Sequence, residues 1–186
     1  HNMNGIPLEA IAPRPGPLMA AADRFTIVID GKGGHGAMPH LCIDVVLIGS
    51  QIVNALQGIA ARNVDPLDSA VVSTTYFHAG DTFNVIPQTL ELRGTVRALT
   101  AKTRDLCEER IRTIVEATCA MHGATATIDY ERGYPVTVNH EKETDFAVSV
   151  ARGVFGDANV DANTPPLMGA EDFSFMLEER PGAYLF

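Results

Sequence analysis

The chain of 186 residues has the length of one ordinary domain, or of one small domain with pieces of another. Hydrophobic residues make up 46% and charged residues 20% of the sequence, which argues against intrinsic disorder. No uninterrupted apolar run approaches the length that spans a bilayer, so we expect a soluble protein without a membrane partner. The formal net charge of -9 argues against nucleic acid and favours small molecules or other proteins as ligands.

Cysteine usage and the two chain ends give further expectations. Cys42, Cys107 and Cys119 are an odd number and form no CxxC pair, so neither a disulfide framework nor a zinc knuckle is predicted. A reducing, cytoplasmic setting fits best, and no signal-peptide pattern is present. The chain begins at His1 without an initiator Met and ends in the apolar run 183–186, so we expect a fragment that is cut at both ends.

The secondary-structure pattern becomes regular from Arg24. The predicted elements are a strand ending near Asp30, a glycine-rich loop over 31–34, a helix over about 43–62, strands over 70–78 and 88–98, a helix from after Thr100 to Gly123, and a strand over about 124–131. In the first strand Phe25, Ile27 and Ile29 occupy alternate positions, the period of a half-buried strand. The apolar face of the second helix is predicted to hold Ile111, Ile114, Val115, Thr118 and Met121.

This order of elements predicts the fold class. A strand, helix, strand, strand, helix and strand form the ferredoxin-like βαββαβ arrangement, an α+β fold in which both helices cover one face of a four-stranded antiparallel sheet. We assign this domain to residues 24–134 and expect the flanks, 1–23 and 135–186, to be parts of a second domain. The second flank is predicted to hold one helix from near Asn139 and another after Gly169. The apolar line of the former consists of Phe146, Val150 and Val154.

The stretch 33–40, Gly-Gly-His-Gly-Ala-Met-Pro-His, is the most unusual in the chain. Three glycines around His35 let the backbone approach a ligand closely while presenting an imidazole. The alternative is a flexible turn with exposed histidines, and the residues alone favour neither interpretation. Asn84, between two predicted strands, is more simply explained as a turn residue. The chain contains no HExxH or GxSxG motif, so no serine triad is supported.

Two arginines and two acids are further candidates for a binding site. Arg97 lies on the polar face of its predicted strand and Arg132 ends the last strand, so their guanidinium groups could converge on a carboxylate. Each arginine alone is more often a solvated surface residue. Glu171 and Asp172 precede a predicted helix, where acids favour the helix dipole without any catalytic role.

Seven short motifs follow one another in a specific order. They are His1-Asn2-Met3 with Gly5-Ile6-Pro7, Arg14-Pro15-Gly16-Pro17, Gly31-Lys32-Gly33-Gly34-His35-Gly36-Ala37-Met38-Pro39-His40, Asn84-Val85-Ile86-Pro87, Arg93-Gly94-Thr95-Val96-Arg97, Arg132-Gly133-Tyr134-Pro135 and Gly169-Ala170-Glu171-Asp172-Phe173. Together they resemble the C-terminal half of the metal-dependent amidohydrolases typified by hippurate hydrolase and the indole-acetyl-amino-acid hydrolases. The resemblance covers essentially the whole chain.

The resemblance implies a domain architecture and a metal site. Members of the family have an α/β zinc-peptidase-like catalytic domain, interrupted by a lid or dimerisation domain that corresponds here to residues 24–134. It implies two divalent ions per full-length subunit, zinc, manganese, cobalt or nickel, and it assigns His1 as a metal ligand. The family's other ligands and its general base have no counterpart in this chain.

The resemblance also implies roles for five other residues. His35 corresponds to a catalytic donor to the developing oxyanion, which in related enzymes reaches the partner subunit's site. Asn84, Arg97 and Arg132 match positions that bind the carboxylate end of the substrate, and Gly169 matches a loop whose backbone passes the substrate.

The expected function is therefore metal-dependent hydrolysis of N-acyl amino acids by a homodimer that pairs through the lid, with this chain inactive alone. The alternative is a non-catalytic dimerisation or binding module of the lid type. An RNA-binding role of the ferredoxin-like fold is set aside, because the sheet lacks stacking aromatics and the net charge is negative.

Overall fold

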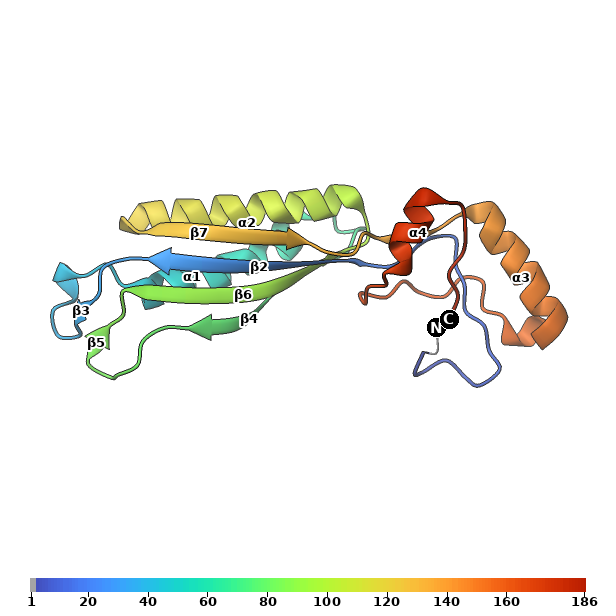
Figure 1. Cartoon of the computed structure of the whole chain (residues 1–186), viewed down its shortest axis with the longest axis horizontal. Coiled ribbons are helices and arrows are strands. Elements are labelled where there is room, and N and C mark those ends of the chain that lie inside the picture. The colour runs from blue at the N-terminus through green and yellow to red at the C-terminus, as the bar shows by residue number, and fades with distance from the viewer. Residues whose placement is uncertain (1–2) are drawn as a thin grey trace. The chain divides into compact units, whose positions relative to one another are not determined.

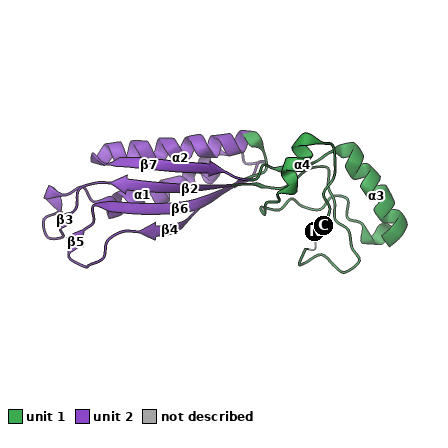
Figure 2. Cartoon of the chain, in the orientation of Figure 1, with its two compact units in different colours: residues 1–22, 98–101, 134–186 green, residues 23–97, 102–133 purple. Residues whose placement is uncertain are grey.

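A computed structural model describes residues 3–186. The chain forms two compact units, shown in Figure 2. One, which we call the sheet unit, comprises residues 23–97 and 102–133. The other, the flank unit, comprises residues up to 22 together with 98–101 and 134–186.

The sheet unit has the predicted ferredoxin-like α+β fold. Its elements in chain order are β2 (Ala21–Asp30), α1 (Val45–Gly58), β4 (Ala70–His78), β6 (Thr89–Ala98), α2 (Ala101–His122) and β7 (Thr125–Arg132). The strands lie in the order β4-β6-β2-β7 (Figure 1). β7 runs antiparallel to β2 in unbroken register, from Asp23 opposite Arg132 to Asp30 opposite Thr125. The two outer strands of this sheet are therefore β4 and β7.

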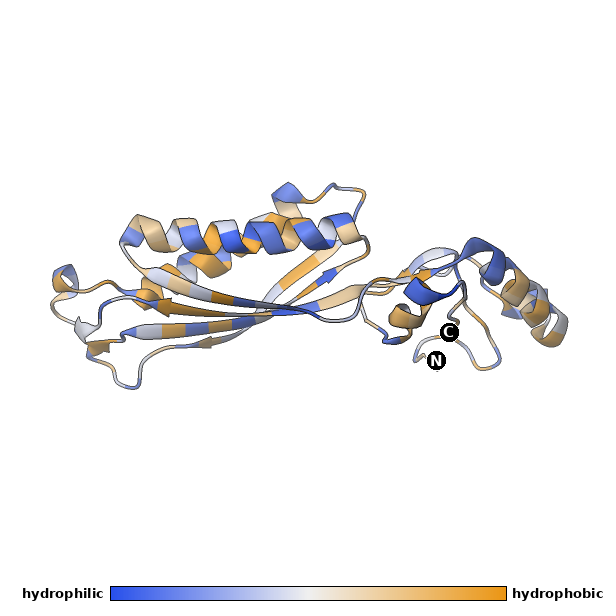
Figure 3. Cartoon of the chain, turned by 45° about the horizontal axis from the view of Figure 1, so that its top comes forward, coloured by the Kyte–Doolittle hydropathy of each residue, from blue (hydrophilic) through white to orange (hydrophobic). Residues whose placement is uncertain are grey.

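One hydrophobic core fills the space between the sheet and the two helices, which lie on the same side of it in Figure 3. The buried core residues include Phe25, Ile27 and Ile29 from β2, Val45, Ile48, Ile52 and Leu56 from α1, Leu90, Leu92 and Val96 from β6, and Cys107, Ile111, Val115 and Cys119 from α2. The alternation in the strands is thus confirmed. Met121 was wrongly placed in the core: it is 70% exposed, because residues two apart on a helix point about 200° apart and the buried line runs through Cys119.

Helix α1 and the turn that follows it agree closely with the helix predicted over about 43–62. Asp44 caps its N-terminus with a carboxylate that accepts the N–H groups of Val46 and Leu47, and the helix continues as a π-helical turn over Ile59–Asn63. By length and composition alone, the segment Val45–Asn63 is long and apolar enough to cross a membrane, although polar residues interrupt it. Its apolar face lies in the core described above, so in this fold the segment serves as a core helix.

The flank unit is built on a two-stranded ladder. β1 (Gly16–Met19) pairs antiparallel with β8 (Thr137–Asn139), and the helices α3 (Glu141–Phe155) and α4 (Phe173–Glu179) follow. The buried Asn139 amide donates to the carbonyls of Arg14 and Tyr184 and accepts the N–H of Tyr184, which ties three segments together.

Helix α3 presents its predicted apolar line to solvent. Phe146 is 73% exposed, and Val150 and Val154 are exposed as well. The helix instead buries Thr144, Val148 and Ala151, of which the last two pack in a small cluster with Val160.

Candidate functional site

The glycine-rich loop and the segment before β6 form one structural feature at one end of the sheet unit (Figure 1). β3 (Gly34–His35) pairs antiparallel with β5 (Val85–Ile86), so that His35 lies opposite Val85. The N–H of Gly36 donates to the carbonyl of Asn84 at 2.8 Å. The structure therefore brings together two of the predicted site residues, His35 and Asn84.

Glycine is required in this loop because the two backbones approach closely. A Cβ atom at Gly33 would lie 2.8 Å from the carbonyl oxygen of Ile86, and one at Gly36 would lie 3.1 Å from that of Asn84. The first distance is shorter than side chains tolerate, so the glycines serve backbone pairing rather than loop flexibility. This outcome argues against the interpretation of the stretch as a flexible turn.

The exposed imidazole of His35 is held by its own turn. The N–H of Ala37 donates to Nδ1 of His35 at 3.1 Å, and the N–H of Met38 donates to the carbonyl of His35 at 2.8 Å. A ring nitrogen that accepts an N–H carries no proton, so this bond assigns the neutral ring a proton on Nε2. The arrangement thus offers Nε2–H as a hydrogen-bond donor.

The structure adds Gln88, which the sequence did not single out, to this loop. Its side-chain amide bonds to Asp30, Gly31 and Gly33, at distances of 2.6 to 3.0 Å. An exposed glutamine just before a strand has no distinctive pattern, because its partners lie 55 or more residues away in sequence. Gln88 also lines a hollow of about 450 Å³ with Val28, His78, Asp81 and Glu91.

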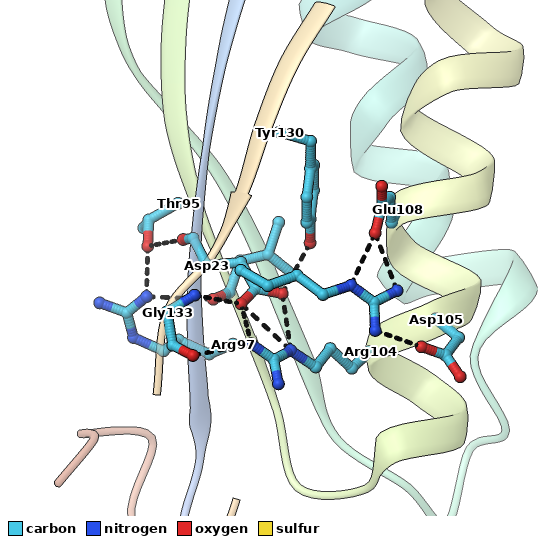
Figure 4. Close-up of polar contacts among 10 residues, drawn as sticks. Asp23, Thr95, Arg97, Arg104, Asp105, Glu108, Tyr130 and Gly133 are labelled. Carbon is cyan, nitrogen blue, oxygen red and sulfur yellow. Dashed lines mark hydrogen bonds and ion pairs between the residues drawn. The ribbon is translucent and has the colours of Figure 1, made fainter. Parts of the chain in front are cut away.

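At the other end of β6 the buried carboxylate of Asp23 organises a second cluster, drawn in Figure 4. Its side chain is 1% exposed and accepts hydrogen bonds from Arg104 Nε at 2.9 Å, from the Tyr130 hydroxyl at 2.9 Å and from the N–H of Gly133 at 3.1 Å. Burial, and then the negative charge of Asp23, raise the pKa of Tyr130 well above its usual range. The hydroxyl therefore remains a donor to the carboxylate.

Arg97 lies beside this cluster, on β6. Its guanidinium donates to the hydroxyl of Thr95 and, at 3.0 Å, to the carbonyl of Val96. Thr95 in turn donates to the carbonyl of Asp23 at 2.9 Å. These contacts hold Arg97 against its own strand.

Arg132 has different partners, on helix α2. Its Nε donates to Glu108 at 2.8 Å and its Nη1 donates to Asp105 at 2.6 Å. The bonds to Glu108 and then to Asp105 raise the pKa of the guanidinium further above its already high value. Arg97 and Arg132 thus bind different groups of their own chain, and the structure does not join them on one carboxylate.

The two clusters are far apart within one chain. Asn84 precedes β6 and Arg97 lies near the end of that ten-residue strand. At about 3.3 Å per residue, the length of the strand separates them by about 30 Å. A small substrate held by Arg97 of one chain could not also contact His35 of the same chain.

The remaining predicted residues are Gly169 and His1. Gly169 lies in the flank unit, where its carbonyl accepts the N–H of Ala20 at 2.8 Å. His1, the predicted metal ligand, lies outside the described residues. Among residues 3–186, no three His, Cys, Asp or Glu side chains lie close enough together to hold a metal ion, so the described part of the chain does not fit a two-metal site.

Known proteins resemble this chain along its whole length. It is 40% identical over 173 residues to hippurate hydrolase of Campylobacter jejuni, which covers 93% of this chain and 45% of the relative. It is 40% identical to thermostable carboxypeptidase 2 of Saccharolobus solfataricus, over all of this chain and 47% of the relative. The chain therefore spans about half the length of the curated relatives it matches.

A solved structure and a family match agree with these relatives. The YXEP protein of Bacillus subtilis, described as a dinuclear metal-binding peptidase of the M20 family, superposes with a TM-score of 0.78 at 33% identity, over 100% of this chain and 45% of its own. Residues 21–122, which include most of the sheet unit, match the family described as the peptidase dimerisation domain. The chain belongs to this M20 dimerisation-domain family.

Proposed function

We propose that this chain is the lid and dimerisation part of an amidohydrolase that cleaves N-acyl amino acids. The names of hippurate hydrolase and carboxypeptidase both describe cleavage of an amide bond next to a free carboxylate. His35 and Arg97 supply the two kinds of group that such a substrate needs, a hydrogen-bond donor for the reacting carbonyl and a guanidinium for the carboxylate.

In this proposal, His35 acts as a catalytic residue. When a nucleophile adds to the amide carbonyl, the oxygen gains negative charge, and the Nε2–H of His35 donates a hydrogen bond to it. The bond from Ala37 to Nδ1 keeps the proton on the outward nitrogen, so the donor is already formed before the substrate arrives. The hydrolysis is proposed to depend on divalent metal ions. Residues 3–186 form no site for them, so what this chain contributes is hydrogen bonding and placement of the substrate.

The observation that carries the proposal of a homodimer is the separation of about 30 Å between the clusters of His35 and Arg97. Both residues can contact one substrate only if they come from different subunits, as a two-fold symmetric dimer allows. The outer strand β4 exposes Tyr76 and Phe77, and α1 exposes Val46 and Leu47, so apolar side chains are available for a second copy.

A chimera tests the role of His35. These 186 residues replace the matching segment of the Campylobacter jejuni hippurate hydrolase, and release of glycine from hippurate is measured. We expect His35→Ala to lower kcat by about 10²-fold, as loss of one oxyanion donor does. His40, another exposed histidine of the stretch 33–40, is the control, and His40→Ala should leave kcat nearly unchanged. An unchanged kcat in His35→Ala would overturn the assignment.

A mixing experiment tests the shared site. His35→Ala and Arg97→Ala chimeras each keep only a small residual activity in the proposal, but a mixed dimer has one site with both residues intact. Half of randomly exchanged dimers are mixed and one of their two sites is complete, so about a quarter of the original activity should return. If the mixture stays as inactive as its parents, the site is not shared between subunits.

The alternative of a non-catalytic dimerisation module is favoured by one observation, the lack of a metal-ligand cluster among residues 3–186. It predicts that the chain dimerises on its own in sedimentation equilibrium. It also predicts that the chimera shows no turnover that depends on a divalent metal.

A further inference from the structure

We propose that Gln88 is a positioning residue for His35, acting through the glycine-rich loop that carries the imidazole. The catalytic consequence depends on the function proposed above. The positioning itself is a property of this chain and can be measured on it directly.

Both N–H groups and the oxygen of the Gln88 side-chain amide form hydrogen bonds. Nε2 donates to Oδ1 of Asp30 at 2.7 Å and to the carbonyl of Gly31 at 2.6 Å, while Oε1 accepts the N–H of Gly33 at 3.0 Å. The backbone carbonyl of Gln88 accepts the N–H of Gly31 at 3.0 Å as well. One residue therefore joins the end of β2 to the beginning of β3.

These contacts specify a carboxamide of this length. A glutamate at position 88 would have no N–H to donate and would place a second carboxylate beside Asp30. An asparagine is one methylene shorter, and an apolar residue of similar size forms none of the three bonds. Glutamine is the side chain that provides two donors and one acceptor at this reach.

The path from Gln88 to His35 is short and continuous. Gly33, held by Oε1, is followed directly by Gly34 and His35, which pair with β5. The same pairing lets the N–H of Gly36 donate to the carbonyl of Asn84. This bond fixes the turn in which the N–H of Ala37 donates to the imidazole of His35. If Gln88 no longer anchors Gly31 and Gly33, the pairing of β3 with β5 is weakened. The bond that orients His35 then weakens with it.

Hydrogen exchange on the 186-residue chain tests the positioning. We expect Gln88→Leu to speed amide exchange of Gly36 about ten-fold, with little change in the urea midpoint of the whole chain. Gln88→Asn keeps an amide that is too short to reach the partners of Gln88, so it should also speed exchange of Gly36. Gln57→Leu is the matched control, because Gln57 is exposed on α1 and its side chain bonds only the carbonyl of Val53. Unchanged exchange at Gly36 in both Gln88 variants would refute the proposal.

The chimera then tests the consequence for catalysis. Gln88→Leu should lower kcat about ten-fold with little change in KM, and it should have no further effect when His35 is already alanine. An equal loss of kcat with and without His35 would show that Gln88 does not act through that residue. Faster exchange in the chain, together with a chimera in which His35→Ala has no effect, would leave the positioning intact and overturn the proposed function instead.

Discussion

Cys107 and Cys42 show how burial sets the chemistry of individual side chains. Burial raises the pKa of the Cys107 thiol to about 11, with smaller effects from the charges of Asp23 and Asp68, and burial also raises the pKa of Cys119. Cys42 is half-buried. With a chromogenic disulfide at pH 8, we therefore expect one thiol, Cys42, to react in the native chain and the other two only after unfolding. If the native-chain reaction is absent in Cys42→Ser, the reacting thiol is Cys42. Prompt reaction of all three thiols in the native chain would contradict the expectation.

Glu108 links the ion pairs of α2 to acid stability. Burial alone would raise its pKa, but hydrogen bonds from Arg112 and Arg132 outweigh burial and lower it. A carboxyl whose pKa is lowered in the folded state stabilises the protein when the pH is above its unfolded-state pKa of about 4.3. This stabilisation is lost as the pH falls through the folded-state pKa. We expect Glu108→Gln to reduce the free energy of unfolding by about 1 kcal/mol at pH 7.

The pH series provides the measurement for Glu108. Urea unfolding between pH 7 and pH 3 should show the original chain losing its advantage over Glu108→Gln below about pH 4, as the carboxyl protonates. Glu131→Gln serves as a comparison, because the pKa of Glu131 is likewise lowered by Arg24 but the pair is exposed. If the difference in the free energy of unfolding between the original chain and Glu108→Gln stays constant from pH 7 to pH 3, the charge of Glu108 does not contribute to stability.

In strand β6, one position tolerates only glycine. A Cβ atom at Gly94 would lie 2.2 Å from the ring of Phe25 and 2.3 Å from the carbonyl of Ser73. Both neighbours are fixed, one in the core and the other in β4, so Gly94→Ala should cost about 2 kcal/mol of the free energy of unfolding. Gly58→Ala is the opposite case, with no atom within 4 Å of the new Cβ in a helical residue, and should stabilise the chain by up to about 1 kcal/mol. Urea unfolding of both variants and of the original chain measures these changes. If Gly94→Ala has the same urea midpoint as the original chain, the backbone around Gly94 shifts to accommodate the Cβ atom at little cost.

The elements that the sequence predicted are those with a long repeating pattern. Alternating residues around Ile27 and a helical repeat through Ile52 depend on neighbours in the sequence, so both appear in the residues themselves. The pairs β1–β8 and β3–β5 were missed because strands of two to four residues have too few positions for a period to emerge. Asp23 and Gln88 were missed for a related reason, since their partners are distant in sequence and an isolated polar residue gives no indication of burial.

The predicted site was only partly recoverable from sequence for a geometric reason. The glycines around His35 point to a close backbone approach, and the structure supplies Asn84 as the neighbour. A strand pattern gives the face of a residue but not its partners, so the sequence did not show that Arg132 pairs with carboxylates on α2 while Arg97 bonds to its own strand. The joint binding of a substrate carboxylate by Arg97 and Arg132 stays a prediction.

In the molecule as a whole, the sheet unit holds its own core. The buried cluster is drawn only from residues between Phe25 and Ala124, and the bond from the N–H of Gly133 to Asp23 joins the first and last residues of the unit. Excising residues 23–133 therefore keeps the core and the Asp23 cluster intact, and leaves both new ends beside each other.

We accordingly expect residues 23–133 to fold alone. Circular dichroism should show one cooperative urea transition, and amide NMR shifts of β6 and α1 should match those of the full chain. Asp23→Ala in the excised piece should destabilise it by about 3–5 kcal/mol, because Arg104 would be left as a buried charge without its carboxylate. If dimerisation resides in this unit, sedimentation will show the same association constant as for 186 residues. A piece that stays unfolded would show instead that the flank unit is required to complete the sheet unit.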